Sequence, residues 1–432
     1  MQIQEFSDFL TNMVSPLLAG ATVSPPSRRQ QRTARSLAAF SVGRIELKVR
    51  ESSAAEMEYT LSRTQEFDDS EKQLVESLVM TYTEAKEAAG SLIEHLVDYI
   101  LARAIARAVA PNVLPQQETI VKVLSKFSDW SAQTYEGTRV SCGVIVHAMS
   151  QGGQDDLTFD EVMGEDFSKA LSDGVETWWG IDAAGVFQGF ATEVAGIGDA
   201  LEADAARQTG QQRGDHGLFP FRYRGLATEA HSGRVGITLN RNGEVLLFAD
   251  GSLKFAKRRG SWVHFAHQAT IKQMSNGGRG PKELRQAIYE SCIDVSFSRS
   301  GACIGLLSRI NEEAFLESHM VAATDILGID GSLKTKVASR LIRNLKFHMV
   351  PRLIRKELLG LDGAIVLRAD GTFYAAGAIL DLGDVERGNQ GGRSAAARAL
   401  GQYGLGVKVS ADGLISGYRV GAEHVETAFK VG

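Results

Sequence analysis

A carboxylate stands directly before an apolar, strand-like run near the C-terminal end of the sequence. The stretch LDGAIVLRADGTFYAAGAIL, residues 361–380, places Asp362 before Gly363 and Ala364. A carboxylate at a strand entry can hold a divalent metal ion and accept a proton from a sugar hydroxyl. A glycine has no Cβ, so a base or ribose can approach its backbone. Taken alone, these three residues are explained more simply by an aspartate that caps a loop.

A glycine-rich segment, GGRSAAARAL (residues 391–400), follows and opens a helix-like run. Gly391 and Gly392 precede a helix start, where backbone N–H groups are available to a phosphate. Arg393 adds a bidentate, charged donor, and Ser394 is able to cap the helix or to donate to phosphate. A plain glycine loop with a serine cap explains the same residues. Ser410, which ends the strand-like GVKVS, is by itself a turn residue.

The chain around these residues alternates between strand-like and helix-like segments. Glu283–Ser300 has the spacing of an amphipathic helix, and Gly301–Ser308 is an apolar strand. Ser332–Lys356 contains no acidic residue and has helical spacing that Pro351 interrupts. The remaining segments are predicted as strand 362–368, turn, strand 372–380, loop, helix 394–403, strand 406–410, turn and strand 414–420. The pattern predicts an α/β (α+β) fold in which helices surround a mixed sheet.

The order of these motifs resembles that of the diadenylate cyclase domain. That family shows a Gly-Ala-apolar strand, then Asp-Gly-Ala, then a Gly-Thr-Arg-His-Arg loop that opens a helix, then a strand ending in Val-Ser before a last hairpin. The resemblance covers residues 284–420, about a third of the chain. The corresponding positions here are Gly301-Ala302, Asp362-Gly363-Ala364, Gly392-Arg393 and Val409-Ser410.

The resemblance implies a domain that binds ATP and uses Mg²⁺ or Mn²⁺. Two such domains would face each other in a homo-oligomer, each presenting one ATP. Asp362 would bind the metal ion and help to activate the 3′-hydroxyl, which attacks the partner's α-phosphate and expels pyrophosphate. Arg393 and Ser394 would share in catalysis at the triphosphate. The nucleotide-binding positions implied are Gly363, Ala364 and Ile379 at the nucleoside, Gly392, Arg393, Ser394 and Ala396 in the triphosphate loop, and Ser410 facing phosphate.

The sequence departs from the family in the phosphate loop. The family's Arg-His-Arg reads here as Arg393-Ser394-Ala395, and Gly392 replaces the preceding threonine. Three interpretations remain open. The small residues mark an active variant; or Arg398, Arg387 or the basic run Lys334–Lys356 supplies the missing charge; or the site binds nucleotide without turning it over.

The 432 residues exceed one typical domain. We expect an N-terminal helix and linker over residues 1–35, the linker being SPPSRRQQR, in which Pro25 and Pro26 block helix. We expect an α+β regulatory region over residues 36–275, with a sensor role by analogy only. The diadenylate cyclase-like domain would occupy residues 284–420. The Gly-rich stretch Ser275–Glu283 is the predicted boundary.

Two features of the N-terminal region have competing interpretations. Cations and aromatic residues are interleaved from Lys254 to Arg285, as in a nucleic-acid patch, but a strand edge protected by charge explains them better. Trp178 and Trp179 suit a hydrophobic core better than a ligand stack. Four histidines without ligand spacing to Cys or carboxylates are interpreted as structural: His95, His147, His264 and His267.

The composition restricts the class of protein further. A formal net charge of -5 does not suggest a general nucleic-acid binder, and three scattered cysteines suit a reducing compartment. The first residues lack the basic region of a signal peptide, and no run suffices to cross a bilayer. We therefore expect a cytoplasmic protein without membrane insertion, and the resemblance implies that it is a diadenylate cyclase. The competing expectation is a catalytically inactive nucleotide- or dinucleotide-binding regulator.

Overall fold

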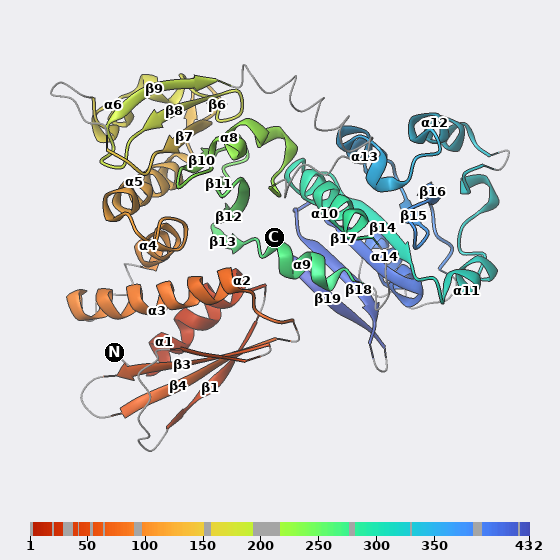
Figure 1. Cartoon of the computed structure of the whole chain (residues 1–432), viewed down its shortest axis with the longest axis horizontal. Coiled ribbons are helices and arrows are strands. Elements are labelled where there is room, and N and C mark those ends of the chain that lie inside the picture. Colours follow the sequence, from red (N-terminus) through yellow and green to blue (C-terminus); the bar gives the residue numbers. More distant parts are fainter. Residues whose placement is uncertain are drawn as a thin grey trace. The chain divides into compact units, whose positions relative to one another are not determined.

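The computed structural model describes residues 3–19, 21–28, 38–41, 43–51, 55–63, 65–89, 97–150, 157–192, 217–275, 281–328, 331–382, 391–421 and 424–432. Helices and strands both occur in each half of the chain, and the strands form sheets of four, seven, six and two strands. The predicted α+β class is therefore confirmed. The described chain divides into two compact units: unit 1 holds residues up to 192 together with 217–266, and unit 2 holds the residues from 267 onwards (Figure 1).

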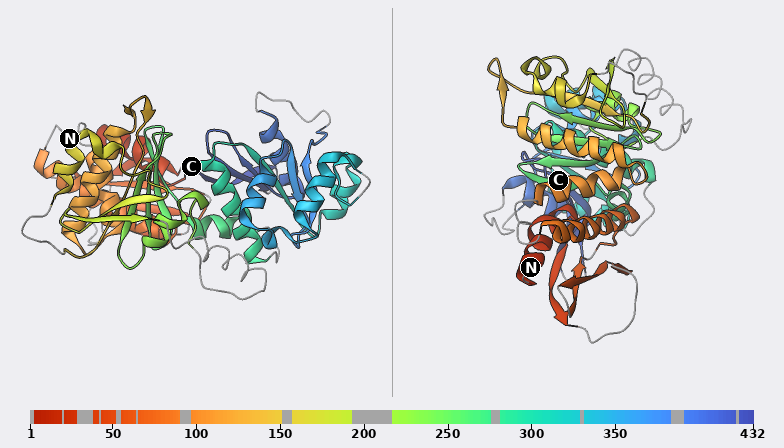
Figure 2. Two further views of the ribbon diagram at one scale, coloured as in Figure 1. Left: turned by 90° about the horizontal axis from the view of Figure 1, so that it is seen from above. Right: turned by 90° about the vertical axis from the view of Figure 1, so that its left-hand side faces the viewer.

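Unit 1 begins with a small antiparallel sheet that is covered by helices on one face. This sheet has the order β1-β4-β3-β2 and is antiparallel, and helix α3 lies across one face of it (Figures 1 and 2). The side chains of Phe6, Tyr59 and Tyr82 meet between the helices and this sheet. The elements are α1 (Ile3–Phe9), the π-helix η1 (Leu10–Val14), α2 (Ser15–Leu17), β1 (Thr22–Arg28), β2 (Ala38–Ser41), β3 (Arg44–Glu51), β4 (Ala55–Ser62) and α3 (Asp69–Ala89).

The interpretation of Ser24–Arg32 as a linker is wrong for its first half. Residues up to Arg28 belong to strand β1, which pairs with β4. The register shifts between Ser24 and Ser27, so Pro25 and Pro26 lie in a β-bulge. A bulge tolerates proline because its residues need not donate to the neighbouring strand. Residues 29–32 lie outside the described part of the chain.

The larger sheet of unit 1 has the order β13-β12-β11-β10-β7-β8-β9. Strands β10 to β13 form an antiparallel meander whose first two turns contain Asn242-Gly243 and Asp250-Gly251, and β8 and β9 form an antiparallel hairpin. Only β7 and β8 pair in parallel within this sheet as described. The elements are α4 (Val97–Val109), α5 (Leu114–Trp130), β5 (Thr134–Tyr135), β6 (Thr138–Arg139), β7 (Cys142–Val146), α6 (Phe159–Gly164), η4 (Asp166–Lys169), β8 (Thr177–Ile181), β9 (Phe187–Thr192), η5 (Phe221–Tyr223), α8 (Arg224–Glu229), β10 (Val235–Leu239), β11 (Val245–Ala249), β12 (Ser252–Arg258) and β13 (Ser261–His264).

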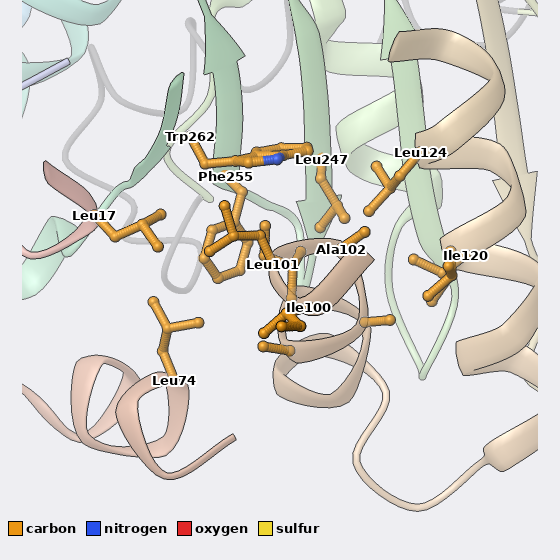
Figure 3. Close-up of a cluster of buried hydrophobic side chains, with 14 of the residues drawn as sticks. Leu17, Leu74, Ile100, Leu101, Ala102, Ile120, Leu124, Leu247, Phe255 and Trp262 are labelled. Carbon is orange, nitrogen blue, oxygen red and sulfur yellow. The ribbon is translucent and has the colours of Figure 1, made fainter. Parts of the chain in front are cut away.

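Side chains from the sheet and from helices α4 and α5 form the core of unit 1 (Figure 3). Phe255 and Trp262 lie inside this core, and Phe265 is also buried. Trp178 and Trp179 are buried as well. None of these five aromatic residues is therefore available to stack on a base, which removes the aromatic half of the nucleic-acid interpretation.

Three cations of the same region are paired with acids. Lys254 lies 3.4 Å from Asp250, Lys257 lies 3.8 Å from Asp98, and the buried Arg258 lies 2.7 Å from Glu244. Strand β13 is an edge of the sheet. The arrangement agrees with a charged sheet edge, which discourages pairing with other chains.

Unit 2 contains a six-stranded mixed sheet of order β16-β15-β14-β17-β18-β19. Strands β14 and β15 are parallel, and every other neighbouring pair is antiparallel. The predicted boundary Ser275–Glu283 lies within this unit, and its residues 276–280 are outside the described part. The elements are α9 (His267–Gln273), α10 (Lys282–Phe297), β14 (Ala302–Leu307), α11 (Glu312–Glu317), η6 (Ala323–Asp325), α12 (Leu333–Ile342), η7 (Phe347–Met349), α13 (Arg352–Leu359), β15 (Ala364–Leu367), β16 (Phe373–Ala378), α14 (Gly392–Tyr403), β17 (Gly404–Val409), β18 (Ile415–Val420) and β19 (Val425–Val431).

Helix α14 packs closely on the middle of this sheet (Figure 1). A Cβ atom on Gly406 of β17 would lie 2.7 Å from the carbonyl carbon of Ala397, so only glycine permits this approach. Ile304 and Val407, which point to the other face, are buried too. The sheet is thus covered on both faces, as mixed sheets with helical crossovers require.

Helices α10 and α13 also pack on the sheet and are joined by two buried ion pairs. Arg352 Nε lies 2.7 Å from an Asp294 carboxylate oxygen, and Arg355 Nη2 lies 3.0 Å from Glu290. Two of the eight cations in the basic run predicted as a source of phosphate-binding charge are therefore used inside the fold. No helix in the described ranges combines the length and apolarity needed to span a bilayer.

Candidate functional site

The strand register of unit 2 brings the predicted site residues to one end of the six-stranded sheet. Cys303 of β14 is level with Ala364 of parallel β15, and Ala302 is level with Val409 of antiparallel β17. The first residues of β14 and β15 therefore lie at the same end as the last residues of β17. Ala364 is also level with Ala378, so β16 ends there as well.

Several predicted site residues follow or precede one of these strand ends. Asp362 and Gly363 enter β15, Ile379 leaves β16, and Ser410 leaves β17. Arg393, in the first turn of α14, lies at this end too, because its guanidinium packs on Gly301 at the entry of β14. Residues separated by more than 100 positions in the sequence, such as Gly301 and Ser410, thus share one edge.

Asp362 is exposed, and within the described residues its carboxylate has no hydrogen bond or ion pair. Gly363 has φ 107°, a conformation that favours glycine. A Cβ there would lie 2.5 Å from the carbonyl carbon of Gly377 and 2.6 Å from the carbonyl oxygen of Ala378. The reason predicted for this glycine needs correction: the adjacent strand β16, and not a base or ribose, occupies the space that its missing Cβ leaves.

The residues around Asp362 suit a metal ion that arrives with phosphates. No group of three or more His, Cys, Asp or Glu side chains with metal-binding geometry occurs among the residues that the structure describes. Mg²⁺ commonly uses one or two carboxylates and takes its other ligands from substrate phosphates and water. A single free carboxylate fits that mode and does not fit a site built from protein ligands alone.

A buried aspartate and a lysine fix the chain next to Asp362. Lys334 Nζ lies 3.0 Å from Asp325 Oδ1 and also donates to the carbonyl oxygen of Gly377. The N–H of Ile379 donates to Asp325 Oδ2 at 3.3 Å. Lys334 is therefore neutralised and anchors helix α12 to β16. The Ile379 side chain is 61% exposed, which leaves an apolar surface open beside the strand end.

Arg393 is exposed and forms no hydrogen bond or ion pair with any part of the chain that the structure describes. Gly391 and Gly392 are exposed, and the positions that their Cβ atoms would occupy are open space. The first turn of α14 thus presents backbone N–H groups and a free guanidinium to solvent. Such a combination attracts anions, phosphate in particular.

Ser394 does not cap the helix, which was one of the two roles considered for it. Gly391 is the N-cap residue, without a side-chain hydrogen bond, and Ser394 is buried within the first turn. Its Oγ accepts a hydrogen bond of 2.7 Å from Lys408 Nζ. Of the other predicted ligands, Ala364 is buried, and Ala396 is half-buried and packs against the hydrophobic cluster beneath α14. The side chain of Ala364 has no access to a nucleotide, so only its backbone is available.

Arg398, another cation considered from the sequence, has an aromatic partner. The Arg398 guanidinium lies over the ring of Tyr418, 5.1 Å from its centre. Arg387 lies outside the described residues. Ser410 closes the turn between β17 and β18, because its N–H and Oγ both donate to Leu414 O and its Oγ also donates to Asp412. It is a turn residue, as its sequence alone indicates.

Lys408 was missed by sequence reasoning although a signal was present. It is the one charged residue in the apolar segment GLGVKV, residues 404–409, which forms a central strand of the sheet. Cations in central strands are uncommon unless a partner or function retains them. Its hydrogen bond to Ser394 places a second positive charge at the first turn of α14.

The cysteines do not supply a nucleophile. Cys142, Cys292 and Cys303 are buried and unbonded to one another. Burial raises the pKa of Cys142 and of Cys303 to about 12, and it raises the pKa of Cys292 also. The reactive form of cysteine is the thiolate, so these thiols are inert at neutral pH.

Comparisons with known proteins give little information about the family or function of this chain. No family model and no curated protein matches this sequence. Among solved structures, a double mutant of DacA from Staphylococcus aureus is similar over 34% of this chain and 87% of its own, with 17% identity and a TM-score of 0.24. Similarity at that level carries no argument about the fold or function of this chain.

Proposed function

We propose that this protein is a diadenylate cyclase that condenses two ATP molecules into cyclic di-AMP and releases two pyrophosphates. One observation carries the proposal: a free carboxylate, Asp362, and a free guanidinium, Arg393, lie at the same end of one sheet, at a strand entry and a helix start. The carboxylate suits a sugar hydroxyl and a phosphate-borne metal ion. The guanidinium and the helix N-terminus suit a triphosphate.

In the proposed reaction the ribose O3′ of one ATP attacks the α-phosphorus of the other. The O3′–P bond forms as the bond to pyrophosphate breaks, and the hydroxyl proton passes to a base. Asp362 is placed to accept that proton or to direct the hydroxyl. Arg393 and the first-turn N–H groups of α14 would stabilise charge on the phosphates. Mg²⁺ or Mn²⁺, bound through Asp362 and the phosphates, would neutralise phosphate charge and acidify the hydroxyl.

The mechanism requires two domains. One domain presents one ATP, and a cyclic dinucleotide needs two, so two copies of unit 2 would have to face each other as a homo-oligomer. Unit 1 is proposed as the regulatory part. We also propose that the protein acts in the cytoplasm, where ATP is present and where the three unpaired cysteines stay reduced.

A nucleotide-binding regulator without turnover is the second candidate. It is favoured by the absence of charge at Ser394 and Ala395, where diadenylate cyclases carry His and Arg. It predicts ATP or dinucleotide binding with no release of pyrophosphate.

The first experiment is to incubate the full-length protein with ATP and Mn²⁺, and separately with GTP, and to identify the products by mass. Cyclic di-AMP would support the enzyme, and product from GTP alone would change the base that we propose. Binding of ATP without product would favour the regulator. If the protein neither forms product nor binds ATP, both candidates are excluded.

A further inference from the structure

Lys408 occupies an unusual place for a lysine. It lies in β17, and its direct cross-strand neighbours are Cys303 on β14 and Ser416 on β18, both buried and uncharged. Residues directly opposite each other point to the same face, so the Lys408 stem runs under helix α14. Its Nζ emerges at the first turn, 2.7 Å from Ser394 Oγ.

Neither Lys408 nor Arg393 has an acidic partner among the described residues. Five other cations of unit 2 do have one: Lys334 with Asp325, Lys346 with Asp370, Arg352 with Asp294, Arg355 with Glu290 and Arg368 with Glu312. The charges of Lys408 and Arg393 are also close in space. Arg393 packs on Gly301, and Lys408 lies beside Cys303, two residues further along the same strand.

A half-buried ammonium group without a counter-ion is costly, because burial removes water that a neutral hydroxyl replaces only in part. Fold stability alone would favour an apolar residue in this strand. An anion bound at the first turn of α14 would offset the cost, since it would face both the ammonium and the guanidinium. Ser394 fits the same purpose. Its Oγ accepts from Lys408, which leaves its own O–H free to donate to that anion.

We propose that Lys408 is a phosphate-binding residue and supplies the positive charge that the loop lacks at Ser394 and Ala395. The triphosphate of ATP would rest between Lys408 and Arg393, with Ser394 donating to it. This inference rests on the proposed function, because it names a further residue of the same nucleotide site. The inference goes beyond the proposed function because it assigns the charge to a strand under the helix and not to the helix itself.

The test compares the affinities of full-length protein for ATP, AMP and adenosine by titration calorimetry. Lys408→Met keeps the length of the stem and removes the charge. Losing one charged hydrogen bond to phosphate should weaken ATP binding by about tenfold to a hundredfold. Adenosine binding should not change, since adenosine carries no phosphate. Lys408→Arg should retain most of the ATP affinity.

Lys282→Met is the matched control. Lys282 is exposed at the start of α10. Leu284, two residues later, packs against Gly371 in the β15–β16 turn, so Lys282 lies at the far end of the sheet. The same loss of charge there should leave ATP affinity within about twofold of the wild type. A general electrostatic effect of charge removal would instead weaken both variants alike, and that outcome would overturn the inference.

The experiment distinguishes an error in the role of Lys408 from an error in the proposed function. If wild-type protein binds ATP and Lys408→Met binds it equally well, the role of Lys408 is wrong and the proposed nucleotide site stands. If wild-type protein binds no ATP, the proposed function itself is wrong. Should Lys408→Met not fold, Ser394→Ala keeps the lysine charge but removes its anchor and the donor hydroxyl. An unchanged ATP affinity in that variant would count against the arrangement.

Discussion

The guanidinium of Arg393 lies against the backbone of Gly301, so closely that a Cβ atom on this glycine would be 2.8 Å from Cζ of the arginine. The entry of strand β14 and the start of helix α14 are thereby in contact. Because Gly301 has no side chain, the guanidinium can rest over the sheet end and still remain open to solvent. The position of the proposed phosphate-binding arginine thus depends on a residue that is remote in sequence.

Replacing Gly301 by alanine should displace Arg393 without unfolding the protein. The new methyl group meets the far end of a flexible side chain, so the arginine moves and the backbone does not. We expect pyrophosphate release from ATP to fall several-fold, while the midpoint of thermal unfolding changes by no more than about 2 °C. Gly164→Ala, at a glycine with open space around its Cβ, is the control. Full activity in Gly301→Ala would show that the arginine position is not critical.

Replacing Asp362 by asparagine should abolish cyclic di-AMP formation and leave stability unchanged. The carboxylate is exposed and has no partner in the described chain, so the fold does not depend on its charge. Product is measured by mass, and stability by urea unfolding. Glu313→Gln, an exposed acid on α11 beyond the opposite end of β14, should keep full activity. A fully active Asp362→Asn protein would contradict the role given to this residue.

Replacing Gly363 by alanine should destabilise unit 2. The residue has φ 107°, and its Cβ would lie 2.5 Å from backbone of Gly377. Strain and the clash with a neighbouring strand should together cost about 2–4 kcal/mol of unfolding free energy. Denaturant titration of the variant measures the loss. Stability equal to that of the wild type would mean that β16 does not approach this glycine as described.

The stability of unit 1 should fall as the pH drops from about 6.5 to 4. Burial lowers the pKa of His264 from its usual 6.5 to about 4, although nearby Asp68 opposes the shift and Lys254 and Arg63 add to it. Between these values the unfolded chain binds a proton that the folded chain does not, so stability rises with pH. The loss of stability over this range is about 3 kcal/mol, and the full stability is reached above about pH 6.5. His264→Phe should flatten the dependence, and an unchanged slope would show that another group titrates.

Much of unit 2 could be predicted from the sequence because its elements are bounded by local signals. The apolar run of β14, the ADG turns on either side of α14 and the helix entry at Gly391 all act within a few residues. The sequence motifs also indicated Asp362 and Arg393 as site residues. Their roles remain proposals, but both are free side chains at one sheet end.

Pro25 and Pro26 show where local signals mislead. Two prolines indicate a linker when the chain is considered by itself, yet strand β4, some 30 residues later, pairs with the segment around them. Backbone hydrogen bonds on either side compensate for the donors that proline lacks. The sequence of the segment contains no pattern that predicts its pairing with another strand.

The sequence by itself determined the types of element, the turns between them and which residues carry charge. Only the tertiary structure decided which charges are free. Lys334, a candidate from sequence, is neutralised by Asp325, whereas Lys408, which was overlooked, reaches Ser394 without an acidic neighbour in the described chain. The physical reason is that the availability of a charge depends on what lies within a few ångströms in space, and strand pairing sets those neighbours across long stretches of sequence.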